Sequence, residues 1–437
     1  MLTFPRNTAK AVSILSIAAI ISAIGFSTIA SPPPPAMPAL NCTIDVDKEL
    51  WIRDLSVVED PVRTKYVPFN PSNPSEGIWT FGRFMENMAG ANNVSKFVLH
   101  LFEQIRDDVV VNGFTVPGRP SFWDQIIQPW IDQSEANGID GLDFTIAPFR
   151  LNGFVNRIDL RTNATYGGGT VSAGEGRIVF TITDIDGNTT IGTLIMEYRL
   201  LANNCEEVKK WAEAWHYLGS LKFGDEFNKN LQEIVEGFAG ANADPNGVNG
   251  SALNQLRTNE VIAGFPWQWR EFQLSAATTL LEQSTVAQTP DISVNHTKAL
   301  RNFVNQNEAA ILANDYIVPL TFAGQPFRGG VSDGEPYDAF YEAPGILNNE
   351  ARHIVSLNTC VGCHSIETGV GFFHSTPRSQ GQETFLSGFL TGITTFDPVS
   401  GVPRSFNDLK RRVDDLCKVL TQTCADFEIE LPFKATH

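Results

Sequence analysis

Residues 177–198, with the sequence RIVFTITDIDGNTTIGTLIMEY, decide the fold class. Two runs rich in β-branched and aromatic residues, 177–182 and 193–198, flank the turn sequence DGN at 186–188. β-branched side chains favour strands, whereas Asp, Gly and Asn tolerate the backbone conformations that tight turns need. The stretch therefore predicts an antiparallel β-hairpin.

Helical periodicity dominates on both sides of this hairpin. Apolar residues recur every three or four positions within 78–135 and again within 206–221. Short β-rich runs at 144–146 and 154–158 extend the hairpin to a sheet. Further helices are predicted at 225–239, 250–257, 296–313, 346–359 and 405–423. We therefore expect an α+β fold, in which an N-terminal antiparallel sheet packs against helices.

The composition excludes several classes of function. Of the 437 residues, 42% are hydrophobic, which is enough to bury a sizeable core. The net charge is −17, from 49 acidic and 32 basic residues. Nucleic acids and anionic membrane surfaces attract basic proteins, so neither is an expected partner.

The first 41 residues have the composition of an export segment. Arg6 and Lys10 precede an apolar stretch, 11–29, that ends in small residues, as in a signal peptide covering 1–30. Retention of this stretch as a membrane anchor is the alternative. Residues 31–41 are a Pro-rich linker. We expect an exported protein with no stable membrane span after cleavage.

A Gly-rich stretch at 329–336 is a candidate boundary between two parts of the mature chain. Residues 42–330 would form the α+β domain, whose function the sequence does not indicate. Residues 331–437 would form a small, mainly α-helical module.

The chemistry-bearing motif lies in this second part. Residues 360–364 read CVGCH, the C-x-x-C-H attachment pattern of c-type haem. On a helix, Cys360, Cys363 and His364 share one face. The two thiols can form thioethers with the haem vinyl groups, and His364 can then bind the iron. With six Cys and seven His in the chain, about 0.001 such motifs are expected by chance.

The second iron ligand is less evident from the sequence. No Met follows Met196, so His374 is the best candidate for the sixth position. Bis-His ligation lowers the reduction potential relative to His/Met ligation. A five-coordinate iron with an open site is the alternative.

Two readings without haem stay open for the same motif. Cys360 and Cys363 could form a disulfide or a redox pair. They could also bind zinc together with two of the histidines His364, His374 and His353.

The other four cysteines are expected to form disulfides, since an exported chain permits them. By exclusion, the sequence suggests the pairs Cys42–Cys205 and Cys417–Cys424. Connectivity does not follow from sequence, so this pairing is a hypothesis.

The order of a helix, the CVGCH motif, a loop and a last helix at 405–423 resembles a small monohaem cytochrome c domain. The resemblance implies covalent haem c, attached outside the cytoplasmic membrane. The mature chain also resembles a group of exported bacterial proteins with one C-x-x-C-H near the C-terminus and no assigned activity. The stretches that carry this likeness are 148–151, 156–161, 255–260, 357–378 and 386–392. It implies a periplasmic or cell-surface location.

The leading expectation is an exported monohaem c-type cytochrome-like protein in electron transfer. Its acidic surface would suit a basic redox partner protein. One alternative is a surface binding or structural protein stapled by zinc or a disulfide at 360–364. A second is a haem-dependent oxidoreductase resembling peroxidases, so the sequence leaves open whether the chain is an enzyme.

Overall fold

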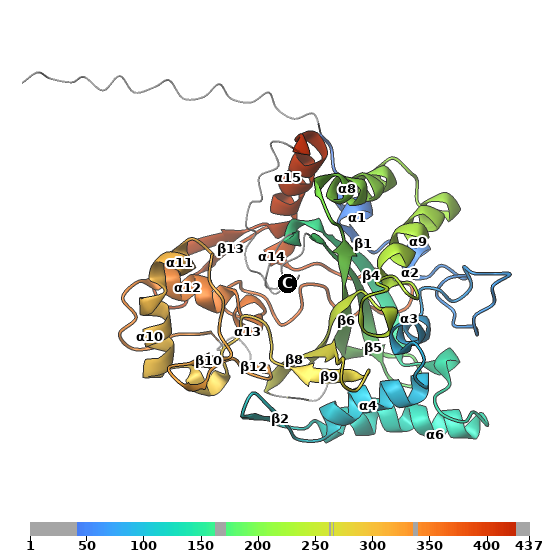
Figure 1. The fold of residues 1–437 in the computed structure, drawn as a ribbon, viewed down its shortest axis with the longest axis horizontal. Coiled ribbons are helices and arrows are strands. Elements are labelled where there is room, and N and C mark those ends of the chain that lie inside the picture. The colour runs from blue at the N-terminus through green and yellow to red at the C-terminus, as the bar shows by residue number, and fades with distance from the viewer. Residues whose placement is uncertain (1–41, 162–171, 262–263, 265, 335–339, 425–437) are drawn as a thin grey trace, which may run out of the picture. The chain divides into compact units, whose positions relative to one another are not determined.

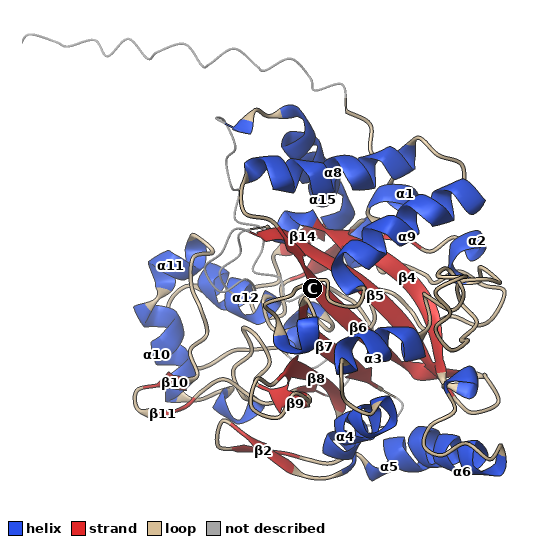
Figure 2. Ribbon diagram, turned by 45° about the vertical axis from the view of Figure 1, so that its right-hand side comes forward, coloured by secondary structure: helices blue, strands red, loops and turns tan. Residues whose placement is uncertain are grey.

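The predicted hairpin lies at the centre of a large sheet (Figures 1 and 2). Strands β5 (Ser172–Thr183) and β6 (Thr189–Leu201) pair antiparallel, and Gly187 takes a φ of 80° in the turn between them. The computed structural model describes residues 42–161, 172–261, 264, 266–334 and 340–424. The antiparallel core of the α+β fold is therefore confirmed.

The sheet has eight strands in the described residues, and all of its pairs are antiparallel. The strand order is β1-β4-β5-β6-β7-β8-β12, and β9 also pairs with β8. The remaining strands of this sheet are β1 (Trp51–Ile52), β4 (Phe149–Arg157), β7 (Leu253–Glu260), β8 (Trp267–Leu274), β9 (Leu281–Ser284) and β12 (Ser332–Gly334).

One face of the sheet is apolar and packs against helices. These are α3 (Phe81–Ala89), α4 (Val94–Arg106), α8 (Cys205–Gly219) and α9 (Asp225–Ala239). The ring of Phe81 stacks on that of Phe149, with centroids 3.9 Å apart. Since side chains alternate between the two faces of a strand, the other face takes the intervening residues.

In the C-terminal part of the chain, the helices between residues 298 and 363 lie on the other side of the sheet, whereas the last helix packs beside α8 (Figure 1). The helices of this part are α10 (Lys298–Gln306), α11 (Glu308–Leu312), α12 (Asn349–Leu357), α13 (Cys360–Cys363), α14 (Gly388–Thr391) and α15 (Asp408–Thr421).

Short elements complete the described chain. The short helices and helical turns are α1 (Val46–Glu49), α2 (Leu55–Val58), α5 (Pro120–Phe122), η1 (Trp123–Ile127), α6 (Gln128–Ala136), η2 (Phe144–Ile146), η3 (Ile158–Leu160), η4 (Val248–Gly250) and η5 (Ile292–Val294). Three small hairpins are β2 (Val109–Val111) with β3 (Phe114–Val116), β10 (Thr321–Phe322) with β11 (Gln325–Pro326), and β13 (Ile393–Phe396) with β14 (Pro403–Phe406).

Two predicted elements are wrong. The expected helix 250–257 lies largely in strand β7, because Gln255, Arg257 and Asn259 are buried polar residues on one face. Leu253 and Leu256 are three positions apart, which is also the spacing of residues on one face of a helix. The expected strand 144–146 is the 3-10 turn η2, which Asp143 caps through the amide of Thr145.

The expected boundary at residues 330 and 331 does not separate two units. Residues Cys42–His437 form one compact unit, and β12 belongs to the large sheet. Arg378 donates from Nε to the carbonyl of Leu151, and its amide donates to Thr181 Oγ1. The C-terminal part is therefore built onto the sheet by strand pairing and buried hydrogen bonds.

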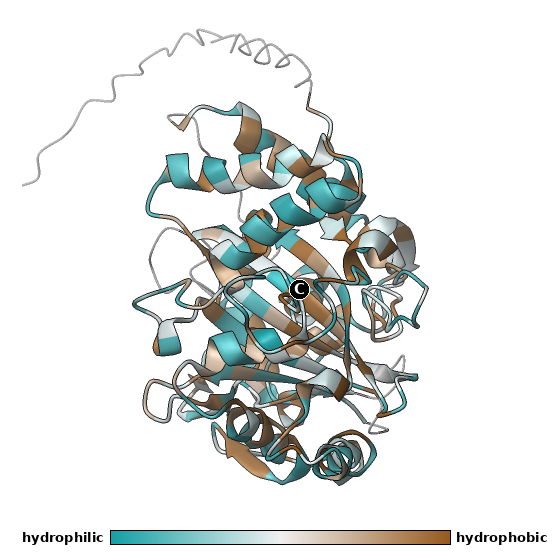
Figure 3. Cartoon of the chain, turned by 90° about the vertical axis from the view of Figure 1, so that its right-hand side faces the viewer, coloured by the Kyte–Doolittle hydropathy of each residue, from teal (hydrophilic) through white to brown (hydrophobic). Residues whose placement is uncertain are grey.

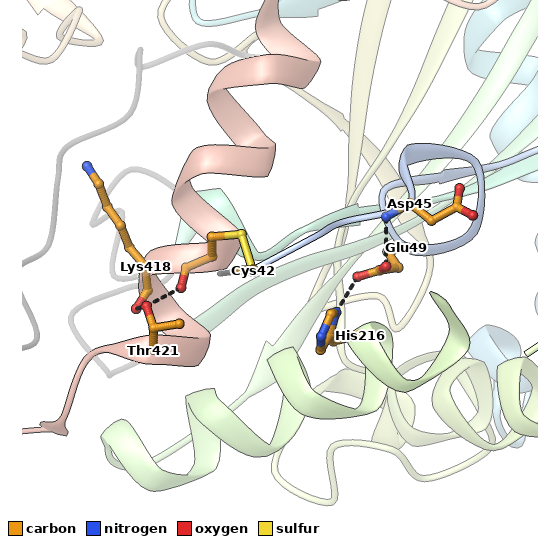
Figure 4. Close-up of a disulfide and its surroundings, with 7 residues drawn as sticks. Cys42, Asp45, Glu49, His216, Lys418 and Thr421 are labelled. Atoms are coloured by element: carbon orange, nitrogen blue, oxygen red, sulfur yellow. Dashed lines mark hydrogen bonds and ion pairs between the residues drawn. A yellow bond between two sulfur atoms is a disulfide. The ribbon is translucent and has the colours of Figure 1, made fainter. Parts of the chain in front are cut away.

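The disulfide pairing also differs from the hypothesis. Cys42 bonds to Cys417, and Cys205 bonds to Cys424, with Cα atoms 5.7 Å apart in each pair (Figure 4 shows the first). Cys417 lies on α15, which ends at Thr421, and Cys424 lies beyond the helix end, so each cysteine meets a different partner. The two bonds tie the end of the chain to its beginning and to α8.

Residues 1–41, with the expected signal peptide and linker, lie outside the described residues. Within the described ranges, no helix combines the length and apolarity that a membrane crossing requires.

Candidate functional site

The second face of the sheet carries a buried ladder of charges. Figure 3 shows the corresponding alternation of hydrophilic and hydrophobic residues along the strands. Arg177 bonds to Glu175 at 2.7 Å and to Glu197 at 3.1 Å. Arg257 bonds to Glu197 at 3.4 Å and to Glu271 at 3.1 Å. Burial raises the pKa of Glu197, against the lowering effect of Arg177 and Arg257. Burying so many charges is costly, which favours a functional role for this face.

Helix α13 places the CVGCH motif over this face. Thr359 caps the helix by accepting a hydrogen bond from the amide of Gly362 at 3.0 Å. Cys360 and Cys363 are buried and are not disulfide-bonded in the structure, which speaks against the alternative of a disulfide between them. Burial raises the pKa of Cys363 well above its usual value, so this thiol is protonated at neutral pH.

His364 is held as one defined tautomer. Its Nδ1 donates to the carbonyl of Phe372 at 2.5 Å, which leaves the lone pair on Nε2. That carbonyl also accepts from Asn259 Nδ2 at 2.9 Å, and Phe372 itself takes a φ of 64°. A bulky residue rarely adopts this conformation, so the loop is constrained to present its carbonyl to His364.

The imidazole of His364 is neutral over a wide pH range. Burial lowers its pKa to about 3, although the hydrogen bond to Phe372 opposes the shift. The ring lies against Trp269, with centroids 4.7 Å apart. A neutral, oriented imidazole whose other nitrogen bonds a carbonyl is the usual form of a metal-binding histidine.

His374 lies beside His364, with ring centroids 4.2 Å apart. Its Nδ1 is 3.0 Å from Ser387 Oγ, and its Nε2 is 3.4 Å from Cys363 Sγ. Two imidazoles on opposite sides of one metal need centroids about 6 Å apart, given bonds of about 2 Å. The structure thus brings both predicted ligands together without placing them across an iron.

A cavity of about 60 Å³ lies between the motif and the sheet. His364, His374 and Leu390 line it from the C-terminal side, and Arg157 and Trp269 are among the residues that line it from the strands. Small-molecule pockets usually measure about 300–1,000 Å³. The donor set of two thiols and an imidazole fits haem c, but a porphyrin needs more room than this cavity offers, so the residues that line it would have to move apart.

Sequence reasoning missed the residues that complete this site. Trp51, Arg157 and Arg412 line the cavity, and Asn259 and Phe372 hold the His364 tautomer. Trp51, Arg157, Asn259 and Arg412 lie far from the motif in the sequence, so no local pattern marks them. The one available signal was the alternation of charged residues within otherwise β-rich runs.

His353 belongs to a different cluster from the cysteines. In the part of the chain that the structure describes, His353, Glu367 and Asp397 are the single grouping with metal-ligand proximity. His353 Nδ1 is 2.6 Å from Glu367, and Arg352 bonds to both carboxylates. Arginine already compensates these charges, and His353 groups with carboxylates instead of the two thiols, which leaves His364 and His374 as the histidines near them for the zinc alternative.

Asp333 on β12 gives a prediction for the pH dependence of stability. Burial, together with the charge of Asp291, raises its pKa to about 6 against the lowering effect of Arg119. Its Oδ1 has no hydrogen-bond partner among the described residues. The folded state therefore binds a proton that the unfolded state releases, and stability is lost as the pH rises through 6.

Asp333→Asn should raise the free energy of unfolding at pH 8 by up to about 3 kcal/mol and change it little at pH 4. Urea unfolding at both pH values measures the difference. Asp140→Asn, the same change in an exposed turn, is the control and should have no effect at either pH. An equal effect of Asp333→Asn at pH 4 and pH 8 would contradict the assignment.

Comparison with protein-family models, with curated proteins and with solved structures found no match.

Proposed function

We propose that this chain is an exported monohaem c-type cytochrome-like protein with haem c attached at the CVGCH motif. Cys360 and Cys363 would hold the haem through thioethers, and His364 would bind its iron. The observation that carries the proposal is the hydrogen bond from His364 Nδ1 to the Phe372 carbonyl, which fixes the tautomer that has its lone pair on Nε2, the form in which a histidine binds a metal. Bound haem would supply one-electron redox chemistry.

The protein's own residues would orient and shield that group. Phe372 and Asn259 fix the ring of His364, and the sheet excludes water from its other side. The mainly helical part after residue 331 would then act as the haem-binding module, built onto the sheet. Two disulfides favour a periplasmic or cell-surface location, where such bonds persist. The net charge of −17 would steer a basic redox partner.

The position of His374 supports a second candidate, a haem-dependent oxidoreductase resembling peroxidases. His374 lies beside His364 and not across from it, and its Nδ1 is within hydrogen-bond distance of Ser387 Oγ. If it stays there, the iron keeps an open position that can bind a substrate. If the loop moves and His374 becomes the sixth ligand, the protein is an electron carrier. A low-spin visible spectrum favours the carrier, and a high-spin spectrum that changes on adding peroxide favours the enzyme.

Cysteine variants test the proposal directly. The protein is co-produced with c-haem maturation proteins, and covalent haem is measured as the pyridine haemochrome after denaturation. The double variant C360A/C363A should lose all covalent haem, and Cys363→Ala alone should leave at most one thioether. Ser365→Ala is the matched control, because its buried hydroxyl has no partner in the structure and its loss should leave the haem in place.

A colourless, folded wild-type protein would contradict the proposal. Zinc in such a protein would support the reading as a zinc-stapled binding or structural protein. A disulfide between Cys360 and Cys363 in solution would support the disulfide staple instead.

A further inference from the structure

Three buried N–H groups beside the cavity lack a hydrogen-bond partner among the residues that the structure describes. They are Trp51 Nε1, Arg157 Nη1 and Arg412 Nη1, on side chains that are at most 7% exposed. All three residues line the cavity next to His364. An unpaired buried donor costs about 1–3 kcal/mol, and more when it is charged. Three such donors around one cavity indicate that an acceptor belongs there.

The rest of each guanidinium is fixed by a carboxylate. Arg157 donates from Nε and Nη2 to Asp159, at 2.9 and 3.1 Å. Arg412 donates from Nε to Asp408 at 2.7 Å, and its Nη2 lies 2.6 Å from the same carboxylate. These ion pairs fix the orientation of both side chains. The N–H groups at Nη1 of each arginine are then left to bind a ligand.

The cluster carries a surplus positive charge. Arg157, Arg411 and Arg412 share two carboxylates, those of Asp159 and Asp408. Three positive charges against two negative ones leave a net charge of +1. Burial lowers the pKa of Arg412 to about 10, and the charge of Arg157 lowers it too, so Arg412 stays charged at neutral pH. One bound anion would neutralise the cluster.

We infer that Trp51, Arg157 and Arg412 form a buried carboxylate-binding site at the edge of the cavity. Arginine binds carboxylates through paired N–H groups, and a tryptophan N–H adds a neutral donor. The carboxylate has two possible sources, a propionate of the haem or a small free carboxylate. The first source rests on the proposed function, whereas the second does not.

Glutamine variants of the two arginines test the haem source in the haem-loaded full chain. Arg157→Gln and Arg412→Gln should lower the midpoint potential, because a propionate loses its cationic partner. The potential should also become dependent on pH between about 5 and 8, where the released propionate titrates. Arg411→Gln removes the same charge from the same cluster at a more exposed position, and it should change the potential less.

Acetate tests the free source in the haem-free chain C360A/C363A. Acetate should raise the melting temperature of this protein if the site takes a free carboxylate, and R157Q or R412Q added to it should abolish the rise. If the Gln variants fail to fold, Arg157→Lys and Arg412→Lys replace them, because lysine preserves the positive charge. The Lys variants should change the midpoint potential, or the effect of acetate on the melting temperature, less than the Gln variants do.

The outcomes distinguish the two sources of the carboxylate, and they separate the carboxylate site from the proposed function. A shift in potential without acetate binding assigns the site to haem propionate, and acetate binding without a shift assigns it to a free carboxylate. If no haem attaches but acetate binds, the proposed function fails and the carboxylate site stands. If neither the potential nor the melting temperature depends on Arg157 and Arg412, the inference is overturned.

Discussion

Arg257→Met should lower the free energy of unfolding by about 3–5 kcal/mol. Arg257 is fully buried and bonds to Glu197 and Glu271 on the neighbouring strands β6 and β8. Removing one partner of a buried ion pair leaves an uncompensated charge, which costs more than the pair itself contributes. Glu197 would keep Arg177 as its only remaining arginine among these ion pairs.

The pH dependence of this loss gives a specific signature. Burial already raises the pKa of Glu197, and losing Arg257 should raise it further. The destabilisation should therefore be largest at neutral pH and shrink as the pH falls and the carboxyl group takes up a proton. Urea unfolding at pH 7.5 and at about pH 4.5 measures both values.

Arg199→Met on the same sheet is the matched control. Arg199 bonds to Asp244 at 2.8 Å, but its side chain is 32% exposed. Such a pair contributes about 1 kcal/mol or less. Equal losses for the two variants would mean that the buried ladder does not have the energetic role argued from its geometry.

Gly362→Ala should lower the free energy of unfolding by about 3 kcal/mol and reduce the amount of folded protein. A Cβ at this position would lie 1.9 Å from the carbonyl oxygen of Ser356. That carbonyl cannot move freely, because it accepts hydrogen bonds from the amide and the hydroxyl of Thr359. The glycine between the two cysteines is therefore required by the packing of α13 on α12.

Thermal and urea unfolding of the two glycine variants measure this effect. Gly237→Ala is the control, since Gly237 lies on the exposed side of α9 and a Cβ there would lie 3.1 Å from the edge of the Trp211 ring, a contact that a shift of a few tenths of an ångström relieves. This change should alter the unfolding free energy by less than about 1 kcal/mol, towards greater stability. A neutral effect of Gly362→Ala would show that α13 packs differently from the structure described above.

Local sequence signals predicted the parts of the fold that local forces determine. The turn at 186–188 predicted the central hairpin, and helical spacing predicted α8 and α9 to within two residues at each end. Strand β7 was not predicted from the sequence, because both of its faces are buried. Its polar residues pair with charges on other strands, so it lacks the clean alternation that marks a half-exposed strand.

The candidate site likewise has one part that the sequence predicts and another that depends on how distant segments pack. The motif 360–364 could be read from the sequence because its spacing is local. Arg157 and Arg412 are 255 positions apart and meet only because α15 packs against the end of β4, through the pair of Arg161 with Asp415 and that of Arg411 with Asp159. The disulfide pairs likewise depend on where α15 lies, which no spacing of cysteines reveals.

The most direct test of the central claim is the mass of the exported wild-type protein, measured under denaturing conditions after production with c-haem maturation proteins. The account predicts a chain that retains two disulfides and the added mass of one haem, with a visible spectrum of the c type. A chain without added haem, correctly folded and with both disulfides formed, would contradict the account.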